Sequence, residues 1–312
     1  MRNAFADELT KLGGEDPRVV MLSGDIGNRL FDKFKAANGD RFFNCGVAEQ
    51  NMMGVAAGLA MSGMRPIAYT ITPFVTTRCL EQIRTDVCYH DVPVIIVSVG
   101  AGLAYAGLGP SHHACEDIAF LRTLPGMTVI CPGDAWEVRA ALRAALAHDG
   151  PCYIRMGKKG EPTVHSDVPT GFEIGKALPV RDGSEVCLLS TGNMLPEAMD
   201  AAERLTAAGR STAVVSFHTV KPLDDAYLKK AFAGFDLVAT LEEHSVIGGL
   251  GSAVAEWLID TETAPGRFLR IGTPDRFYKQ AGEQEYARDQ LGLTGVQIAQ
   301  RVQDKLARRD HP

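Results

Sequence analysis

Short apolar runs alternate along the chain with longer stretches in which apolar residues recur at every third or fourth position. The short runs predict buried β-strands, and the periodic stretches predict α-helices with one buried face. In the first half of the chain, we expect strands at residues 18–23, 41–45, 66–71, 93–100, 127–132 and 152–156. We expect helices near residues 3–12, 29–37, 49–62, 75–88, 114–123 and 134–147. This alternation is typical of parallel sheets that carry helices on both faces.

The alternation is interrupted once, near the middle of the chain. Residues 157–185 are rich in glycine, proline and charged residues, which favours a linker. Strand-like runs then return at residues 186–192, 211–218, 237–244 and 267–274. We therefore expect an α/β protein with two doubly wound domains, the second smaller than the first. The predicted limits are residues 1–165 for the first domain, 166–182 for the linker and 183–312 for the second domain.

Composition narrows the class of function. A chain of 312 residues with 46% hydrophobic residues can bury the cores of two domains. The net charge of −6 and the lack of a Lys/Arg-rich run argue against nucleic-acid binding. No apolar stretch approaches membrane-spanning length, and residues 1–22 predict an amphipathic helix and a strand rather than a signal peptide. We expect a cytoplasmic protein without a membrane or nucleic-acid partner.

The seven cysteines are scattered through the chain and form no C-x-x-C pair. This spacing is a poor match for zinc or iron–sulfur sites, and most of these residues lie within apolar segments. We expect reduced thiols in the core. The residues are Cys45, Cys79, Cys88, Cys115, Cys131, Cys152 and Cys187.

Three features follow predicted strands, at the sheet edge where ligands bind in this architecture. They are Glu49 in "GVAEQN", the stretch "YTITPF" at residues 69–74, and "GAGLAYAGLGPSHHACED" at residues 100–117. A carboxylate, an aromatic ring and paired histidines that converge at one edge predict a binding or catalytic site. From the residues alone, a carboxylate placed at a helix start by the helix dipole is the favoured interpretation of Glu49, and a working acid in a cleft is the alternative.

These motifs also carry a family resemblance. "GVAEQN", "GVAAGLAMSGMRPIAYTITPF" and "GPSHHACEDIAFLRTLPGMTVICPGDAWE" resemble the pyrimidine-binding domain of transketolase and of 1-deoxyxylulose-5-phosphate synthase. In the second half, "LSTGNMLPEAMDAAERL", "VKPLD" and "EEHSVIGGLGSAVAEWL" resemble the C-terminal domain of the same enzymes. The resemblance covers nearly the whole chain, with the motifs in the same order.

The resemblance implies thiamine diphosphate as cofactor. It gives Glu49 the hydrogen bond to N1′ of the aminopyrimidine, which favours the imino tautomer that deprotonates the thiazolium ring. Phe74 matches an aromatic residue that stacks on the pyrimidine, although a phenylalanine after a strand is more often a core residue. Asp25 matches an aspartate close to the cofactor, with strand-end capping as the alternative.

The resemblance also implies substrate-binding residues. His112 matches a histidine that faces the substrate, where imidazole can donate to a developing alkoxide and shuttle a proton. Arg155 and Lys158 match basic residues, one of which grips a sugar phosphate; solvated charges at a linker start are the alternative. Gly100 and Leu108 stand where transketolase carries a histidine and an aspartate that bind substrate hydroxyls. We therefore expect a roomier, less polar channel that suits a modified or bulkier sugar.

No G-D-G motif occurs in the chain, whereas family members anchor the diphosphate through Mg²⁺ held by such a motif. The expected protein is thus one subunit of a split transketolase that transfers a two-carbon ketol unit from a ketose or its phosphate to an aldose. A separate subunit would supply the diphosphate domain and the Mg²⁺ ligands, in a two-plus-two heterotetramer. Two alternatives stay open: the β subunit of a 2-oxo acid dehydrogenase, and a non-catalytic regulatory subunit.

Overall fold

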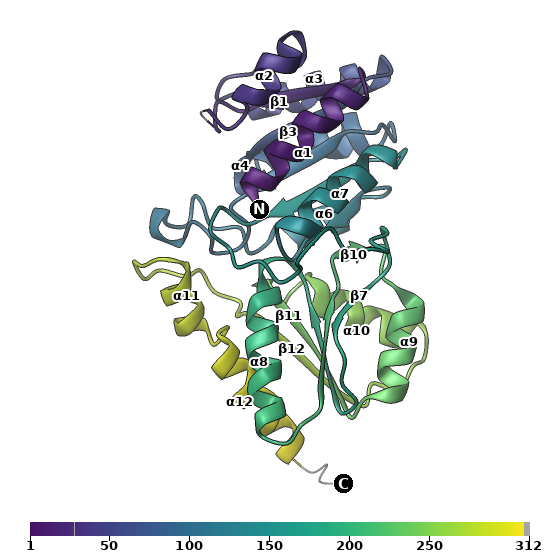
Figure 1. Cartoon of the computed structure of the whole chain (residues 1–312), viewed down its shortest axis with the longest axis vertical. Helices are drawn as coiled ribbons and strands as arrows, with labels where there is room; N and C mark the ends of the chain where they lie inside the picture. Colours follow the sequence, from purple (N-terminus) through teal and green to yellow (C-terminus); the bar gives the residue numbers. More distant parts are fainter. Residues whose placement is uncertain (28, 309–312) are drawn as a thin grey trace.

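The computed structural model describes residues 1–27 and 29–308. Two α/β domains lie one above the other along the longest axis, with the first half of the chain at the top of Figure 1 and the second half below it. Each domain has its own sheet with helices on both faces. The expected fold class of two mostly parallel, doubly wound domains is confirmed.

The first sheet has seven strands in the order β10-β5-β6-β4-β3-β1-β2, and only β10 runs antiparallel to its neighbour. Its strands are β1 (Val19–Ser23), β2 (Phe42–Asn44), β3 (Arg65–Ile71), β4 (Ile95–Val99), β5 (Thr128–Ile130), β6 (Cys152–Met156) and β10 (Thr219–Lys221). The helices of this domain are α1 (Arg2–Glu15), α2 (Asp32–Asn38), α3 (Glu49–Met61), α4 (Thr72–Val75), α5 (Leu80–Gln82), α6 (Asp117–Arg122) and α7 (Ala135–Ala147).

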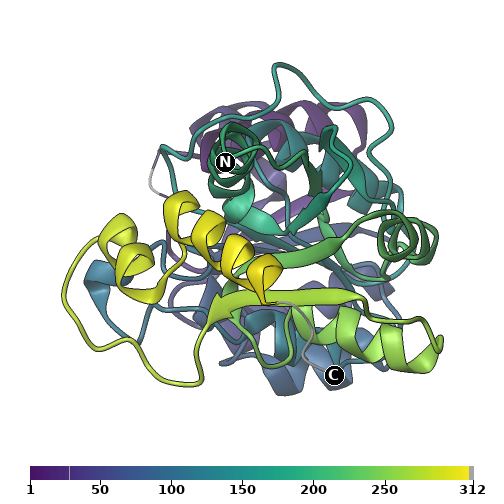
Figure 2. The same ribbon diagram turned by 90° about the horizontal axis from the view of Figure 1, so that it is seen from below.

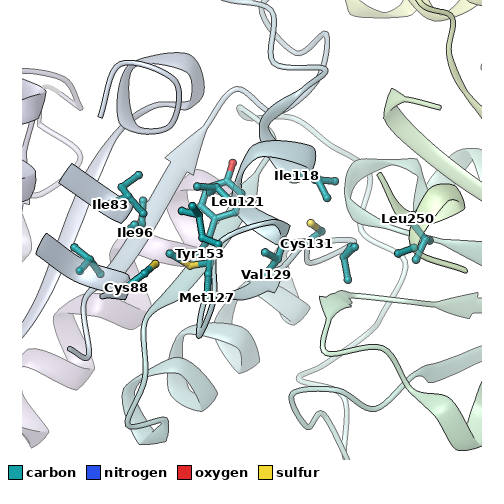
Figure 3. Packing of buried hydrophobic residues seen from close by; sticks show 14 of the residues in the cluster. Ile83, Cys88, Ile96, Ile118, Leu121, Met127, Val129, Cys131, Tyr153 and Leu250 are labelled. Carbon is teal, nitrogen blue, oxygen red and sulfur yellow. The ribbon is translucent and has the colours of Figure 1, made fainter. Parts of the chain in front are cut away.

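Alternate residues of the strands enter two separate cores, because successive side chains of a strand point to opposite faces. Met21 and Tyr69 pack with α1 and α7 on one face, whereas Val20 and Ala68 pack with α3 on the other. The core on the α3 side continues into the second domain, where it includes Leu250 (Figure 3).

The second sheet has five strands in the order β12-β11-β8-β9-β7, with β7 antiparallel to β9. Its strands are β7 (Leu178–Arg181), β8 (Val186–Ser190), β9 (Thr212–Ser216), β11 (Leu237–Ser245) and β12 (Arg267–Thr273). Its helices are α8 (Leu195–Ala207), α9 (Asp225–Gly234), α10 (Leu250–Asp260), α11 (Gln284–Leu291) and α12 (Gly295–Ala307). Helices α8 and α12 cover one face of this sheet, and α9 and α10 cover the other. In Figure 2, which views the molecule from below, the yellow helix α12 lies across the sheet.

Each strand predicted from the apolar runs has a counterpart, with ends that coincide or differ by at most two residues. Two strands were not predicted. β7 lies inside the range 166–182 expected to be a linker, so part of that range belongs to the second sheet. β10 is three residues long and leaves the second domain to pair with β5 of the first.

The single helix expected at 75–88 is broken. It forms α4, a turn, α5 and a π-helical turn at Ile83–Cys88. Three consecutive β-branched residues, Val75, Thr76 and Thr77, disfavour continuation of α4, because such side chains lose χ1 freedom in a helix. The turn that results carries Arg78, which enters the site described below.

Within the described ranges, no helix combines the length and apolar character that crossing a membrane requires.

Candidate active site

Glu49 is the first residue of α3, and its side chain is only 2% exposed. Its carboxylate accepts a hydrogen bond of 2.8 Å from Nη1 of Arg78. Ala48 occupies the N-cap position, and no side chain caps the helix. The Glu49 carboxylate is thus directed at a charged partner from another segment and not at the first N–H groups of its own helix.

The ends of β1 and β3 pack closely against Glu49 at the start of α3. A methyl group added at Gly24 would lie 3.0 Å from Thr70 and 3.4 Å from Cγ of Glu49, so a larger residue here would require these neighbours to shift. The hydroxyl of Thr70 is buried without a hydrogen-bond partner among the described residues. A hydroxyl in this state beside a buried carboxylate can bond a ligand that enters here.

Phe74 lies in α4, directly after β3, and its ring faces two polar groups. The guanidinium carbon of Arg78 lies 4.2 Å from the centre of the ring. The imidazole of His112 lies 5.3 Å from the same centre, at an interplanar angle of 67°. Glu49, Phe74 and His112, predicted separately from three motifs, therefore form one cluster that Arg78 joins together.

His112 belongs to the loop between β4 and α6, where its Nδ1 lies 3.0 Å from the hydroxyl of Ser111. Partial burial, and the neighbouring His113 to a smaller degree, lower the pKa of His112 below its ordinary value. The imidazole is accordingly neutral near pH 7 and can both donate and accept a proton. His113 points elsewhere, with its Nε2 3.1 Å from the carbonyl of Ala106.

The expected space at Gly100 does not exist. Gly100 has φ +90°, and a Cβ at this position would lie 2.2 Å from the ring of Tyr105. Tyr105 fills the volume that a larger residue would need, and its ring centre lies 6.3 Å from that of His112. The prediction of a roomier channel at Gly100 is therefore wrong. Leu108, in a short turn of the same loop, is 59% exposed.

Asp25 follows β1 with φ +56° and is exposed. Its Oδ1 accepts a hydrogen bond of 2.8 Å from Nδ2 of Asn44, at the end of the neighbouring strand β2. This contact fastens the two strand ends together, as the capping alternative requires, and leaves the second carboxylate oxygen without a protein donor among the described residues.

Arg155 contradicts both sequence interpretations, since it is neither solvated nor open to a phosphate. Its side chain is 1% exposed, and its guanidinium donates to Asp117 (2.7 Å) and to the carbonyls of Ala114 (2.9 Å) and Glu243 (3.0 Å). The reason is that β6 is a central strand whose end is covered by the second domain. Burial acts to lower the pKa of Arg155, but the charge of Asp117 outweighs it and raises the pKa further above its ordinary value.

Lys158 is partly exposed, and its Nζ lies 3.3 Å from Oε2 of Glu283 in the second domain. Both side chains line a cavity of about 330 Å³ between the domains, together with Lys159, Asn193 and Arg288. Acidic side chains are as numerous here as basic ones. The role of Lys158 in holding a phosphate stays a prediction.

Arg78 and Tyr105 are the site residues that sequence reasoning missed. Arg78 follows Phe74 by four residues, the spacing that brings side chains together in a helical segment, so this spacing could have indicated it. Nothing in the sequence indicated that Tyr105 would fold back over Gly100, because the loop that connects them has no regular periodicity.

Two further observations concern cofactors and thiols. Among residues 1–27 and 29–308, no group of three or more His, Cys, Asp or Glu side chains could hold a metal ion. All seven cysteines are free, and five of them are buried, as expected for core thiols. Burial, and to a smaller degree the charge of Glu49, raise the pKa of Cys79 to about 12.

Both halves of the chain match known domain families. Residues 1–162 match the model of the transketolase pyrimidine-binding domain, and residues 175–298 match that of the transketolase C-terminal domain. A putative transketolase C-terminal section from Methanocaldococcus jannaschii is 37% identical over 308 residues, which cover 98% of this chain and 96% of that protein.

Two further relatives are similar over their whole length. A 6-deoxy-6-sulfo-D-fructose transketolase subunit from a Clostridium species is 36% identical, with 99% of this chain and 95% of that protein covered. A solved structure described as a split-gene transketolase in an inactive β4 tetramer superimposes with a TM-score of 0.88 at 39% identity. The superposition covers 98% of this chain and 97% of that one.

Proposed function

Since this chain belongs to the transketolase family, we propose that it is the pyrimidine-binding subunit of a split, thiamine diphosphate-dependent transketolase. The observation that carries this proposal is the convergence of Glu49, Phe74 and His112 at one sheet edge. A buried carboxylate beside an aromatic face fits an aminopyrimidine, which needs a hydrogen-bond partner at its edge and a flat surface beneath its ring.

Each residue of the cluster receives a separate role. When bound, thiamine diphosphate supplies the carbon that attacks the ketose carbonyl. Glu49 would hold N1′ of the pyrimidine and share its proton, and Phe74 would support the ring. His112, neutral near pH 7, would donate to the substrate oxygen as charge develops there and would later recover the proton. Asp25 would lie at the same edge and help to close the cofactor site.

A partner subunit completes the proposed enzyme by holding the diphosphate and Mg²⁺. The names of two relatives, a C-terminal section and a transketolase subunit, support a split arrangement. Phe43 and Val47, which precede Glu49 by six and two residues, are 47% and 75% exposed and offer apolar groups for such a partner to cover. We propose a heterotetramer of two chains of each kind.

The proposed reaction transfers a two-carbon ketol unit from a ketose to an aldose. Leu108 cannot accept a hydrogen bond, and Tyr105 narrows the space beside His112, so the substrate-side wall combines an aromatic ring and an aliphatic side chain. A hydroxyl held against leucine would lose its water without gaining a partner. We propose that the enzyme prefers a modified ketose or aldose to the common pentose phosphates. Lys158 would contact a phosphate, or another anionic group, on that sugar.

Reconstitution tests this function. The chain alone should neither bind thiamine diphosphate tightly nor transfer ketol units, and addition of a subunit that carries a diphosphate-binding domain should create both properties. Binding is measured by calorimetry, and transfer is measured on a panel of ketoses and aldoses with and without phosphate. Tight, Mg²⁺-dependent binding by the isolated chain would contradict the split site.

The same panel tests the substrate proposal through Leu108→Asp, with the exposed Val296→Asp on the second domain as a matched control. The aspartate at 108 should raise kcat/KM for hydroxyl-rich pentose phosphates about tenfold, since it restores a hydrogen-bond acceptor. If the wild type already prefers pentose phosphates and neither substitution changes that preference, the substrate proposal is wrong.

A further inference from the structure

Arg78 makes both of the contacts that the aminopyrimidine of the cofactor needs. Its Nη1 donates to Oε2 of Glu49 at 2.8 Å, and its guanidinium stacks over the ring of Phe74 at 4.2 Å. A guanidinium is planar and carries N–H donors along its edge, so it resembles an aminopyrimidine in shape and in hydrogen bonding. One carboxylate and one ring face are thus already occupied in the unassembled chain.

The side chain of Arg78 is held by these two contacts and by little else. It is 42% exposed, and Glu49 is its one hydrogen-bond acceptor among the described residues. Its backbone lies in the turn between α4 and α5, outside any long helix. Arg155 differs in each respect, since it is buried and bound by three groups. Arg78 can therefore leave its position without breaking the fold.

Glu49 explains why an arginine stands here. Its carboxylate is 2% exposed, and a buried charge without a counterion is strongly destabilising. In the absence of ligand, Arg78 neutralises this charge. The same arginine competes with any ligand that needs the Glu49 carboxylate and the face of Phe74.

We propose that Arg78 occupies the aminopyrimidine position of the free subunit and must be displaced before the cofactor binds. The inference rests on the proposed function, because it takes thiamine diphosphate as the ligand of Glu49. It means that the affinity of the assembled enzyme for its cofactor is reduced by the fraction of time that Arg78 spends in the site.

The test measures thiamine diphosphate binding by the complex with its partner subunit, using labelled cofactor and rapid filtration. Arg78→Ala should bind about 3- to 10-fold more tightly and associate faster than the wild type, because an occupancy of about nine-tenths by Arg78 costs about tenfold in affinity. Arg78→Lys, which keeps the charge without the planar stack, should fall between the two. The matched control is Arg84→Ala, which removes an exposed arginine paired with Glu81 on the next turn and should change nothing.

A second readout uses the unassembled chain and no cofactor. Arg78→Ala should lower the urea midpoint of unfolding in the wild-type background and leave it unchanged in a Glu49→Gln background, where no buried charge needs a counterion. Weaker or unchanged cofactor binding by Arg78→Ala, with normal binding by the wild type, would overturn this inference alone. If the wild-type complex itself fails to bind thiamine diphosphate, the proposed function fails and the inference with it.

Discussion

Among the described residues, the charged cluster at the candidate site and the charged cluster between the domains differ in how many partners their carboxylates have. In the site, Glu49 has one donor and Arg78 one acceptor among the described residues, and both the arginine and His112 are partly open to solvent. Between the domains, Glu243 is fully buried and receives four partners. These are the N–H of Leu103 and the side chains of Asn193, Gln284 and Arg288.

This difference distinguishes a cluster that holds the domains together from a cluster that can bind a ligand. A network in which each charge is saturated by protein groups has no bond left for a ligand, and its role is to fix the two domains in place. A cluster whose buried carboxylate has a single, partly exposed partner is where a ligand can add bonds. Charge alone does not distinguish the two, since Arg155 matched a candidate phosphate ligand in the sequence and is buried among protein partners.

The largest expected effect is on stability, at the interdomain cluster. Glu243→Ala would leave Arg288 buried without its main counterion and should lower the free energy of unfolding by about 3–5 kcal/mol. Urea unfolding measures the change. The matched control is Glu256→Ala, which breaks the more exposed interdomain pair with Arg122 and should cost about 1 kcal/mol or less. Equal losses in the two variants would remove the proposed contrast between buried and exposed pairs.

The second effect is on catalysis, at the site. In the reconstituted complex, Glu49→Gln should reduce turnover by about 10²-fold or more, because glutamine can hydrogen-bond N1′ but cannot share a proton with it. Cofactor affinity should change far less. Steady-state kinetics and calorimetry separate the two. Glu81→Gln, an exposed carboxylate two helical segments away, serves as the control. Near-normal turnover of Glu49→Gln would show that Glu49 has only a structural role.

The smallest expected effect is on the pH dependence of stability, through a histidine at the domain boundary. His244 is fully buried, with Nδ1 2.8 Å from the carbonyl of Ser245 and Nε2 accepting from the N–H of Ala119. Burial lowers the pKa of His244 to about 4. As the pH falls below about 6.5, His244 becomes protonated in the unfolded chain but stays neutral in the folded chain. The contribution of His244 to stability therefore declines by about 2–3 kcal/mol by pH 4.

Neighbouring Glu242 acts in the opposite direction. Burial raises its pKa to about 7, so its contribution to stability grows as the pH falls through 7 towards the unfolded value near 4.5. The measurement must therefore be a difference: the stability of the wild type minus that of His244→Gln should decrease from pH 7 to pH 4. A difference that stays constant would show that His244 titrates alike in both states.

Sequence reasoning was sufficient where the determinants are local. The alternation of apolar runs predicts most strands of both sheets, and the motifs at strand ends predict that Glu49, Phe74 and His112 lie near one another, because parallel strands bring their carboxyl ends to one edge. It failed where partners are distant in the chain. The burial of Arg155 depends on Asp117, 38 residues away, and on Glu243, 88 residues away.

Two other errors have a similar origin. The space beside Gly100 depends on how a glycine-rich loop folds back, and the ring of Tyr105 fills it. The strand β7 falls within a range whose glycine, proline and charged residues favour a linker, yet edge strands tolerate a proline such as Pro179 on their unpaired side.

Strand β10 has a consequence for the order in which the chain can fold during its synthesis. The outer edge of β5 pairs with Thr219 and Lys221, so the sheet of the first domain lacks its last strand until residue 221 has left the ribosome. Until then the first domain presents an open β edge, which is a template for pairing with other chains. The nascent first domain is thus most exposed to aggregation while the second is being translated, and the arrival of a three-residue strand ends that period.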